Sequence, residues 1–305
     1  MGRTRPPLPG PSTSRKRPRI SVVVISRNEG ASLRSTVENL EDTLSPSGDV
    51  LVIDDGSTDG SAAFLARRRG RVRLIREKGI GVTKARNLGA KSCRGDVIVF
   101  ADAHITLDPF WWRPLLELLE DPRVGAAAPA ISRLDIPHKA GYGLTFRGPG
   151  LEVRWLRRKY RAPVAAPILP GCCVAMRRDV FEATGGWDEG LLQRGNVDNE
   201  CGVRLWLLGY ELMVTSETVV GHLFRRRSPY PVGWPQFLQN RLRLAFVHFK
   251  PQRLSKVVGA LRQAPLFAPA FLMLSESNVA ARRREMLARR VRNDDWFFER
   301  FGLKW

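Results

Sequence analysis

The sequence predicts an α/β protein in which helices flank a mixed, mostly parallel sheet. Short β-branched, apolar runs alternate with segments of helical periodicity between residues 20 and 101. This alternation is typical of parallel strands that are joined by helical crossovers. Past residue 234 the pattern is mostly helical, which predicts a helical region at the end of the chain.

The elements of the first half follow in a regular order. The run 20–26 (ISVVVIS) is bounded by polar residues and predicts a buried strand. The other strands expected in this half are 50–53, 72–75 and 96–101. The expected helices are 30–42, 61–69 and 83–92. Polar residues that follow such strands lie at the carboxyl edge of the sheet, where ligands bind in open α/β folds.

The second half is less regular. Helices are expected at 109–119, 178–184 and 199–209, the last ended by Gly209. Strands are expected at 124–128, 172–176 and 211–219. Residues 135–170 are rich in Gly, Pro and Arg, and we expect loops with short elements there.

Three regions follow from the composition along the chain. Residues 1–19 carry six basic and no acidic side chains with almost no large apolar ones, which predicts a disordered basic tail. Residues 20–250 form the expected main domain. Residues 251–305 form the expected helical C-terminal extension.

The overall composition excludes several classes of protein. The chain has 305 residues, of which 43% are hydrophobic and 26% charged, so it is neither globally disordered nor collagen-like. Its four cysteines form no C-x-x-C pattern, which fits a reduced compartment. We expect a cytoplasmic protein, because no secretory signal or membrane span is evident.

The net charge of +20 suits nucleic acid, anionic lipid or a phosphorylated small molecule. A solvated basic face explains it equally well. We expect no specific nucleic-acid partner, because the chain contains no recognised module of that kind. A peripheral contact with the inner face of a membrane stays open, through residues 265–274 or the basic, aromatic end of the chain.

Several polar clusters follow the predicted strands. Asp54 and Asp55 can accept hydrogen bonds from a nucleoside, although an ordinary βα turn uses the same residues. Asp102 and His104 are two residues apart in an extended stretch, so both side chains point to one side. With His222, which follows a later strand, they could form a three-ligand site whose oxygen and nitrogen donors suit Mn²⁺.

Two further features bear on catalysis. Asp198 and Glu200 open the helix expected at 199–209, either as caps or with Asp198 as a general base. The turn that contains Trp187 and Asp188 offers an aromatic face and a carboxylate, which suit a sugar but also occur in ordinary loops.

Together these segments resemble the nucleotide-sugar glycosyltransferases of family 2 type, which have the Rossmann-like GT-A fold. The resemblance spans residues 20–230 and rests on the order of VVVISRNE, VIDDGSTDGS, GIGVTKARNLGA, DAH, GCCVAMRRDVFEATGGWDE and DNECGVRLWLLGY. The DAH triplet and VGHLFRRRSPY look like the metal-site segments of the polypeptide N-acetylgalactosaminyltransferases.

The resemblance implies roles for individual residues. Asp102, His104 and His222 would ligate Mn²⁺ (or Mg²⁺) on UDP. Arg86 would lie near the donor diphosphate, and Arg225 and Tyr230 on a loop that closes over the donor. The full set that it implies for the nucleotide sugar is Ser26, Arg27, Glu29, Asp54, Asp55, Arg86, Asp102, Gly171, Trp187, Asp188, Arg225 and Tyr230.

The expected function is metal-dependent transfer of a hexosyl or N-acetylhexosaminyl group from a UDP-sugar to an acceptor hydroxyl. The N-acetylgalactosaminyltransferases have a Glu where this chain has Val197, and inverting family 2 enzymes have an Asp at Asp198. We therefore favour inversion with Asp198 as the base; the alternative is a retaining, N-acetylgalactosaminyltransferase-like enzyme. The acceptor could be a glycan, a lipid carrier, a peptide or a small molecule.

Two functions of other classes stay open. A nucleotidyltransferase is disfavoured, because the first strand runs into Ser26, Arg27, Asn28 and Glu29, where those enzymes have a Gly-rich phosphate loop. The second function is that of a binding protein without turnover, whose basic surface holds nucleic acid or anionic lipid. It is disfavoured by the intact set of three metal-ligand candidates.

Overall fold

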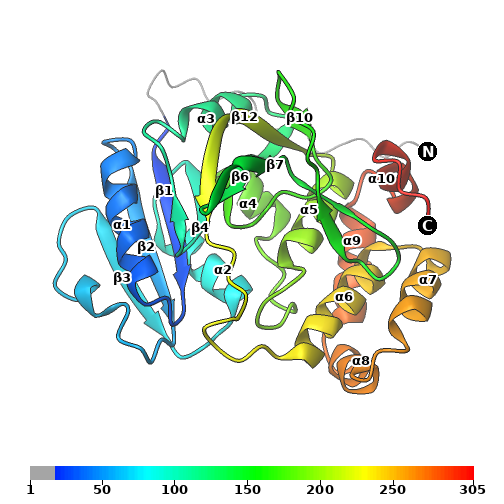
Figure 1. Ribbon diagram of the computed structural model, residues 1–305. Helices are drawn as coiled ribbons and strands as arrows, with labels where there is room; N and C mark the ends of the chain where they lie inside the picture. Colours follow the sequence, from blue (N-terminus) through cyan, green and yellow to red (C-terminus); the bar gives the residue numbers. More distant parts are fainter. Residues whose placement is uncertain (1–17) are drawn as a thin grey trace.

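A computed structural model of the protein describes residues 18–305 (Figure 1). Of the basic tail expected at 1–19, residues 1–17 therefore lie outside the described part. A ten-stranded mixed sheet runs through the molecule, with helices on both faces. The α/β class and the mostly parallel first half of the sheet are confirmed.

The parallel half of the sheet has the order β3–β2–β1–β4. Its strands are β1 (Ile20–Ser26), β2 (Asp49–Asp55), β3 (Val72–Glu77) and β4 (Val97–Asp102). Within this half Ser26 pairs with Asp54, and Ile25 pairs with Asp102. The register therefore brings the ends of three strands together at the carboxyl edge of the sheet.

The other half mixes directions. Strand β11 (Cys173–Arg177) runs antiparallel to both β4 and β6 (Val124–Arg133). Strand β12 (Glu211–His222) is parallel to β6, and the short β5 (Ile105–Thr106) is antiparallel to β12. The other strands are β7 (Ile136–Gly141) and β10 (Val164–Ala165) on this sheet, and the hairpin of β8 (Leu144–Phe146) and β9 (Val153–Trp155).

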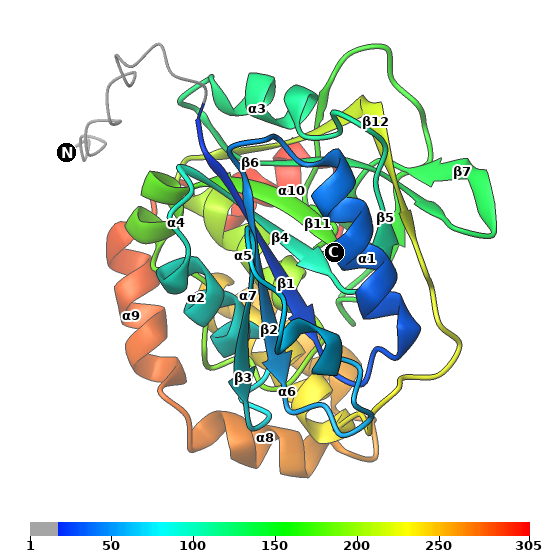
Figure 2. The ribbon, with the colours of Figure 1, turned by 90° about the vertical axis from the view of Figure 1, so that its left-hand side faces the viewer.

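Two hydrophobic cores cover the two faces of the sheet. Val22 and Val24 of β1 belong to one core, and Val23 between them belongs to the other, as the alternation of side chains along a strand requires. Helices α1 (Ala31–Thr43) and α2 (Val82–Ser92) stand on opposite faces of β1 (Figure 2). The other helices of residues 18–230 are α3 (Arg113–Leu119), α4 (Arg178–Thr184) and α5 (Val197–Leu207).

The prediction of a helix at 61–69 is wrong. The structure has a single 3₁₀ turn there, η1 (Ala63–Leu65). Within 61–69 only Ala62 and Leu65 are buried, and the segment ends in three consecutive arginines before Gly70. The segment has too little apolar surface to hold a longer helix against the sheet.

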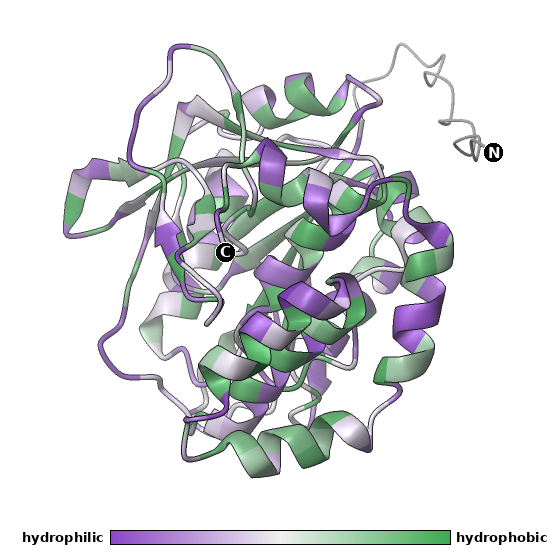
Figure 3. Ribbon diagram, turned by 90° about the vertical axis from the view of Figure 1, so that its right-hand side faces the viewer, coloured by the Kyte–Doolittle hydropathy of each residue, from purple (hydrophilic) through white to green (hydrophobic). Residues whose placement is uncertain are grey.

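The last part of the chain is helical, as expected for 251–305. Its helices α7 (Pro251–Leu261), α8 (Phe267–Ser275), α9 (Val279–Arg289) and α10 (Asp294–Arg300) follow α6 (Trp234–His248). They pack into the same core as the sheet through buried residues such as Val257, Leu274 and Phe297. Figure 3 shows this side of the molecule coloured by hydropathy.

No helix within residues 18–305 is long and apolar enough to cross a bilayer. The expected compartment and the peripheral membrane contact stay predictions.

Candidate active site

A cleft of about 650 Å³ opens at the carboxyl edge of the sheet. Its floor comes from the ends of β1, β2 and β4, and its rim from the segments 192–198 and 223–231. The site residues expected from the sequence that line it are Arg27, Glu29, Asp55, Arg86, Asp102, His104, Gly171, Asp198, His222, Arg225 and Tyr230. The structure therefore brings together residues that are up to about 200 positions apart in the sequence.

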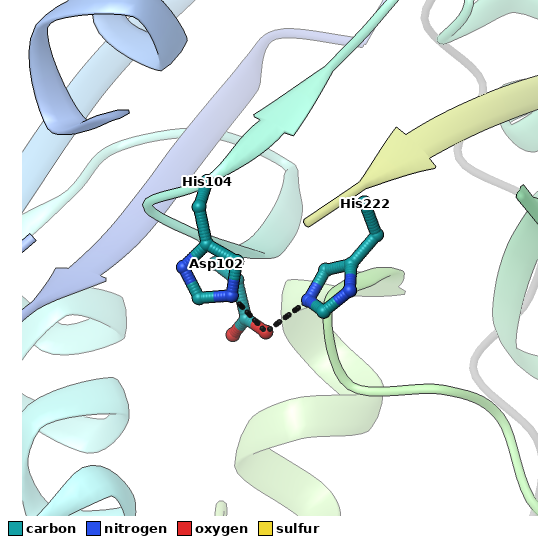
Figure 4. Close-up of side chains that lie close together, drawn as sticks. All are labelled: Asp102, His104 and His222. Atoms are coloured by element: carbon teal, nitrogen blue, oxygen red, sulfur yellow. Dashed lines mark hydrogen bonds and ion pairs between the residues drawn. The ribbon is translucent and has the colours of Figure 1, made fainter. Parts of the chain in front are cut away.

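Asp102, His104 and His222 meet on the floor of this cleft (Figure 4). One ligand atom from each residue lies within 4.8 Å of the other two. The His222 Nε2 atom is 3.2 Å from Asp102 Oδ2, and the His104 Nε2 atom is 4.0 Å from the same oxygen. One carboxylate oxygen and two imidazole nitrogens make a donor set that suits Mn²⁺.

The local pairing of strands explains how His222 reaches the other two. Asp102 is the last residue of β4, and the chain then turns into β5 with His104 just before it. Strand β5 pairs with the end of β12, so that Ile105 lies opposite His222. The backbone N–H of Leu223 also donates to the His104 carbonyl at 3.1 Å. This two-residue strand fixes the distance between the two histidines.

Glu29 contacts His104 of this cluster on the ring edge that faces away from Asp102. Its Oε2 atom is 3.0 Å from Nδ1 of His104 and 2.6 Å from Nη1 of Arg225. Glu29 is buried, so its carboxylate has little other solvation. Histidine ligands of metals commonly donate their other ring N–H to a carboxylate, which fixes the tautomer and the ring orientation. Glu29 fits that supporting role better than direct contact with a sugar nucleotide.

The charges around Asp102 keep it ionised. Burial raises the pKa of this carboxyl group, but His222, His104 and Arg86 together lower its pKa to about 2. The carboxylate is therefore negative across the neutral range and is available as a ligand for a cation.

Arg86 connects the metal-ligand candidates with Asp198. Its guanidinium donates to Asp198 Oδ1 at 3.1 Å and to the carbonyl of Gly171 at 2.8 Å. It is also 4.0 Å from Asp102 Oδ1 and lies over the ring of Trp187 at 4.3 Å. Arg86 is 4% exposed. A charge held this firmly at the cleft floor suits a diphosphate.

The two aspartates at the end of β2 have different hydrogen-bond partners. Asp54 Oδ1 accepts from the N–H of Ser57 at 3.0 Å, and the side chain does not line the cleft. Asp55 lines the cleft and accepts from the N–H groups of Ile80 and Gly81 at 2.6 and 3.0 Å. Asp54 thus has the turn role that was the alternative, whereas Asp55 stays a candidate for the nucleoside.

Besides Asp54, three further expected donor residues lie outside the cleft. Asp188 is 5% exposed and forms a buried ion pair with Arg243, with an N–O distance of 2.8 Å. Trp187 is buried between Arg86 and Phe100. Ser26 is buried at the end of β1 and does not line the cleft. These three side chains do not line the cleft, and their contact with the sugar nucleotide, which the resemblance implies, stays a prediction.

The loop 223–233 covers one side of the cleft. Arg225 reaches Glu29, and Arg27 lies over the ring of Tyr230 at 5.1 Å. Arg194 donates to Ser228 at 3.1 Å, which holds the loop to the segment 192–198. Burial raises the pKa of Tyr230. The structure thus shows this loop held against the cleft by residues that follow β1 and by Arg194 in the segment before α5.

The sequence analysis missed several residues of the cleft. Gln193, Gly195 and Asn196 line its rim, and Gln193 and Asn196 have positive φ angles of 50° and 58°. A Gly-Asn pair directly before the acidic start of a helix was a signal for such a turn. Phe237 also lines the cleft, but no local pattern singles it out within α6. Glu200, by contrast, is fully buried and pairs with Arg204 and His248.

Comparisons with known proteins agree with this geometry. The family model described as "Glycosyl transferase family 2" matches residues 21–185. Human polypeptide N-acetylgalactosaminyltransferase 15 is 31% identical over 252 residues, covering 75% of this chain and 39% of that protein. Polypeptide N-acetylgalactosaminyltransferase 11 of Xenopus tropicalis is 30% identical over 256 residues, covering 75% of this chain and 42% of that protein. The chain spans about two-fifths of the length of these relatives.

Solved structures show the same fold. A crystal structure of GalNAc-T7 with UDP, GalNAc and Mn²⁺ has a TM-score of 0.74 at 22% identity, over 92% of this chain and 57% of that one. The mannosyltransferase PcManGT from Pyrobaculum calidifontis, with GDP-Man and Mn²⁺, has a TM-score of 0.54 at 20% identity, over 90% of this chain and 75% of that one. The GT-A fold is thereby confirmed.

The chain belongs to glycosyl transferase family 2. The expectation of a nucleotide-sugar-dependent enzyme is confirmed, and the alternative of a basic binding protein without turnover is disfavoured. The expected Mn²⁺ agrees with the Asp-His-His cluster and with the metal in both solved neighbours. The roles of the individual site residues stay predictions.

Proposed function

We propose that the protein transfers N-acetylgalactosamine or a related sugar from a UDP-linked donor to an acceptor hydroxyl, with the help of Mn²⁺ and with retention at the anomeric carbon. The observation that carries the proposal is the Asp102–His104–His222 cluster on the floor of a cleft of about 650 Å³. The choice of N-acetylgalactosamine comes from the names of the relatives, and the cluster is where we expect the diphosphate of the donor to bind.

The residues present fit a divalent cation. Glu29 faces Nδ1 of His104, which leaves Nε2 of that ring for a metal. Asp102 is ionised, and His222 offers Nε2 on the same side. When bound there, the ion supplies positive charge that stabilises the leaving nucleoside diphosphate.

The rest of the chemistry falls to the residues around the cluster. Arg86 holds a buried positive charge 4.0 Å from Asp102, close to where a metal-bound diphosphate would lie. Arg225 on the loop 223–233 adds a second charge at the rim. Fixed charges in a site that excludes water stabilise developing negative charge without reorganisation. The loop would keep water from the anomeric carbon while the donor is held.

The geometry at Asp198 supports a positioning role. The Asp198 carboxylate is ion-paired with Arg86 at 3.1 Å, and Arg86 is buried at the floor of the cleft. We therefore assign Asp198 to positioning Arg86. The similarity to polypeptide N-acetylgalactosaminyltransferases also favours the retaining alternative over the inversion that Asp198 first suggested.

The acceptor would approach over the outer rim of the cleft. Pro231, Gln236 and Phe237 line the cleft on that side. An aromatic ring beside an amide suits a peptide segment that presents a serine or threonine hydroxyl. A peptide is therefore the first acceptor to test, and a lipid-linked glycan is the second acceptor to test.

Calorimetric titration tests the donor site. We expect UDP and UDP-N-acetylgalactosamine to bind in the presence of Mn²⁺, to bind at least tenfold more weakly in EDTA, and to lose the Mn²⁺ effect in Asp102→Ala. Asp108→Ala removes an exposed aspartate nearby and should bind as the wild type does. Equal affinity in Asp102→Ala and wild type would overturn the metal site. The anomeric configuration of the product, read by NMR, decides between retention and inversion.

A further inference from the structure

Helix α8 carries apolar side chains on both of its faces. Ala270 and Leu274 are buried against the rest of the molecule. Leu266 just before the helix and Phe271 and Leu272 within it are 38%, 47% and 58% exposed. A helix on the surface of a soluble protein normally has a polar outer face. Helix α8 is coloured mostly hydrophobic in Figure 3, and its exposed side chains include Phe271 and Leu272, which indicates that something apolar covers it.

The chain that leads into α8 is basic. Residues 218–275 contain nine Arg and Lys side chains and no Asp or Glu, and Glu276 follows α8. Lys256 in α7 and Arg262 just after it are exposed, and within residues 18–305 neither is ion-paired with a carboxylate. Exposed apolar side chains beside unpaired cations are the pattern of a segment that binds an anionic membrane surface.

The position of α8 relative to the cleft fits this interpretation. Strands β1, β2 and β3 point toward the lower end of the molecule in Figure 2, and α8 lies flat across that same end. Between the two stands the start of α6, where Trp234 is 62% exposed and its ring is 5.9 Å from that of Phe237. Phe237 lines the cleft. An exposed Trp at this point is suited to the headgroup region of a bilayer.

We infer that α8, the exposed cations Lys256 and Arg262, and Trp234 form a docking face for an anionic lipid bilayer. The axis of α8 would lie in the plane of the membrane, with Phe271 and Leu272 among the acyl chains and the cations at the headgroups. The cleft would then open beside the membrane, so that acceptors displayed there are presented to the site. The docking does not depend on the sugar or on the stereochemistry.

Vesicle co-sedimentation of the full chain tests this inference. Vesicles of phosphatidylcholine alone are compared with vesicles that also contain phosphatidylglycerol. We expect binding to the anionic vesicles, and a decrease of about tenfold or more in the partition coefficient for Phe271→Ser/Leu272→Ser. This variant keeps the net charge, so it separates insertion of α8 from general attraction of a basic protein. Lys256→Glu/Arg262→Glu should weaken the binding as well.

The matched control is Leu287→Ser/Val291→Ser, which removes two exposed apolar side chains in and just after α9. Helix α9 stands on another side of the molecule in Figure 2, so this variant should bind as the wild type does. The inference is overturned if wild type does not bind anionic vesicles, or if it binds no better than the α8 variant. Light scattering without lipid tests whether a second copy covers α8 instead; a wild-type dimer that the α8 variant abolishes would also overturn it.

Discussion

Glu29 lies 3.0 Å from Nδ1 of His104 and holds the histidine from the side that faces away from Asp102. The same carboxylate oxygen is 2.6 Å from Arg225, on the loop that covers the cleft. One buried acid thus joins a metal-ligand candidate to the loop. Closure of the loop and the orientation of the ligand are therefore linked through Glu29.

This relationship predicts that Glu29 tunes metal affinity. Glu29→Ala should weaken Mn²⁺ binding by about 10- to 100-fold, because His104 loses the group that fixes its tautomer and ring orientation. The Mn²⁺ affinity of Glu29→Gln should lie between that of Glu29→Ala and that of the wild type. Calorimetry with Mn²⁺ alone measures the effect. Glu38→Ala, which removes an exposed acid on α1, is the control. Unchanged Mn²⁺ affinity in Glu29→Ala would contradict the role.

Much of the fold was predictable because local and global preferences agree. The prediction for β1 matches the structure from Ile20 to Ser26, since the strand is buried on both faces and reads as one apolar run. The prediction for α4 matches from Arg178 to Thr184. The prediction of a helix at 61–69 was wrong, because this segment has helical periodicity but buries almost no apolar side chain against the sheet. Periodicity reports which residues could be buried, whereas tertiary packing decides whether they are.

The site was predictable only where its residues follow a strand. Asp102 and His104 were found because they come directly after β4. The approach of His222 depends on the β5–β12 pairing, and β5 has only two residues. The position of Asp188 outside the cleft depends on its ion pair with Arg243, which lies 55 residues further along the chain. Long-range ion pairs of this kind leave no local pattern.

Asp198→Asn separates a positioning role from general-base catalysis. We expect kcat to fall by about tenfold, because Arg86 loses one of its two anchors while no proton acceptor is removed. Loss of a general base costs about 10²- to 10⁴-fold and alters the pH profile of kcat. Steady-state kinetics over pH measures both quantities, and Asp179→Asn on α4 is the control. A fall of a thousandfold with a changed pH profile would restore inversion with Asp198 as base.

The buried ion pair between Glu200 and Arg204 predicts an acid-dependent stability. Burial raises the pKa of Glu200, but Arg204 and His248 lower it well below its usual value. A depressed carboxyl pKa stabilises the fold above the pKa of the unfolded state, about 4.3, and that contribution is lost as the pH falls toward the folded-state pKa. Glu200→Gln should lower the free energy of unfolding at pH 7 by about 3–5 kcal/mol, since Arg204 loses its partner.

Urea denaturation at several pH values tests this prediction. The difference in unfolding free energy between the wild type and Glu200→Gln should be constant above about pH 5 and should shrink below about pH 4. Glu182→Gln, an exposed acid on α4, should show no such dependence. A difference that stays constant down to the acid end would mean that the charge of Glu200 does not support the fold.

Gly171 leaves room for the carboxylate of Asp198. A Cβ atom at this position would overlap Asp198, and the carbonyl of Gly171 accepts from Arg86 at 2.8 Å. Gly171→Ala should therefore push Asp198 away from Arg86 and lower donor affinity by about tenfold. Calorimetry with UDP and Mn²⁺ measures the affinity. Gly148→Ala, where a Cβ meets nothing within 4 Å, is the control. Wild-type donor affinity in Gly171→Ala would show that the Arg86–Asp198 pair does not shape the donor site.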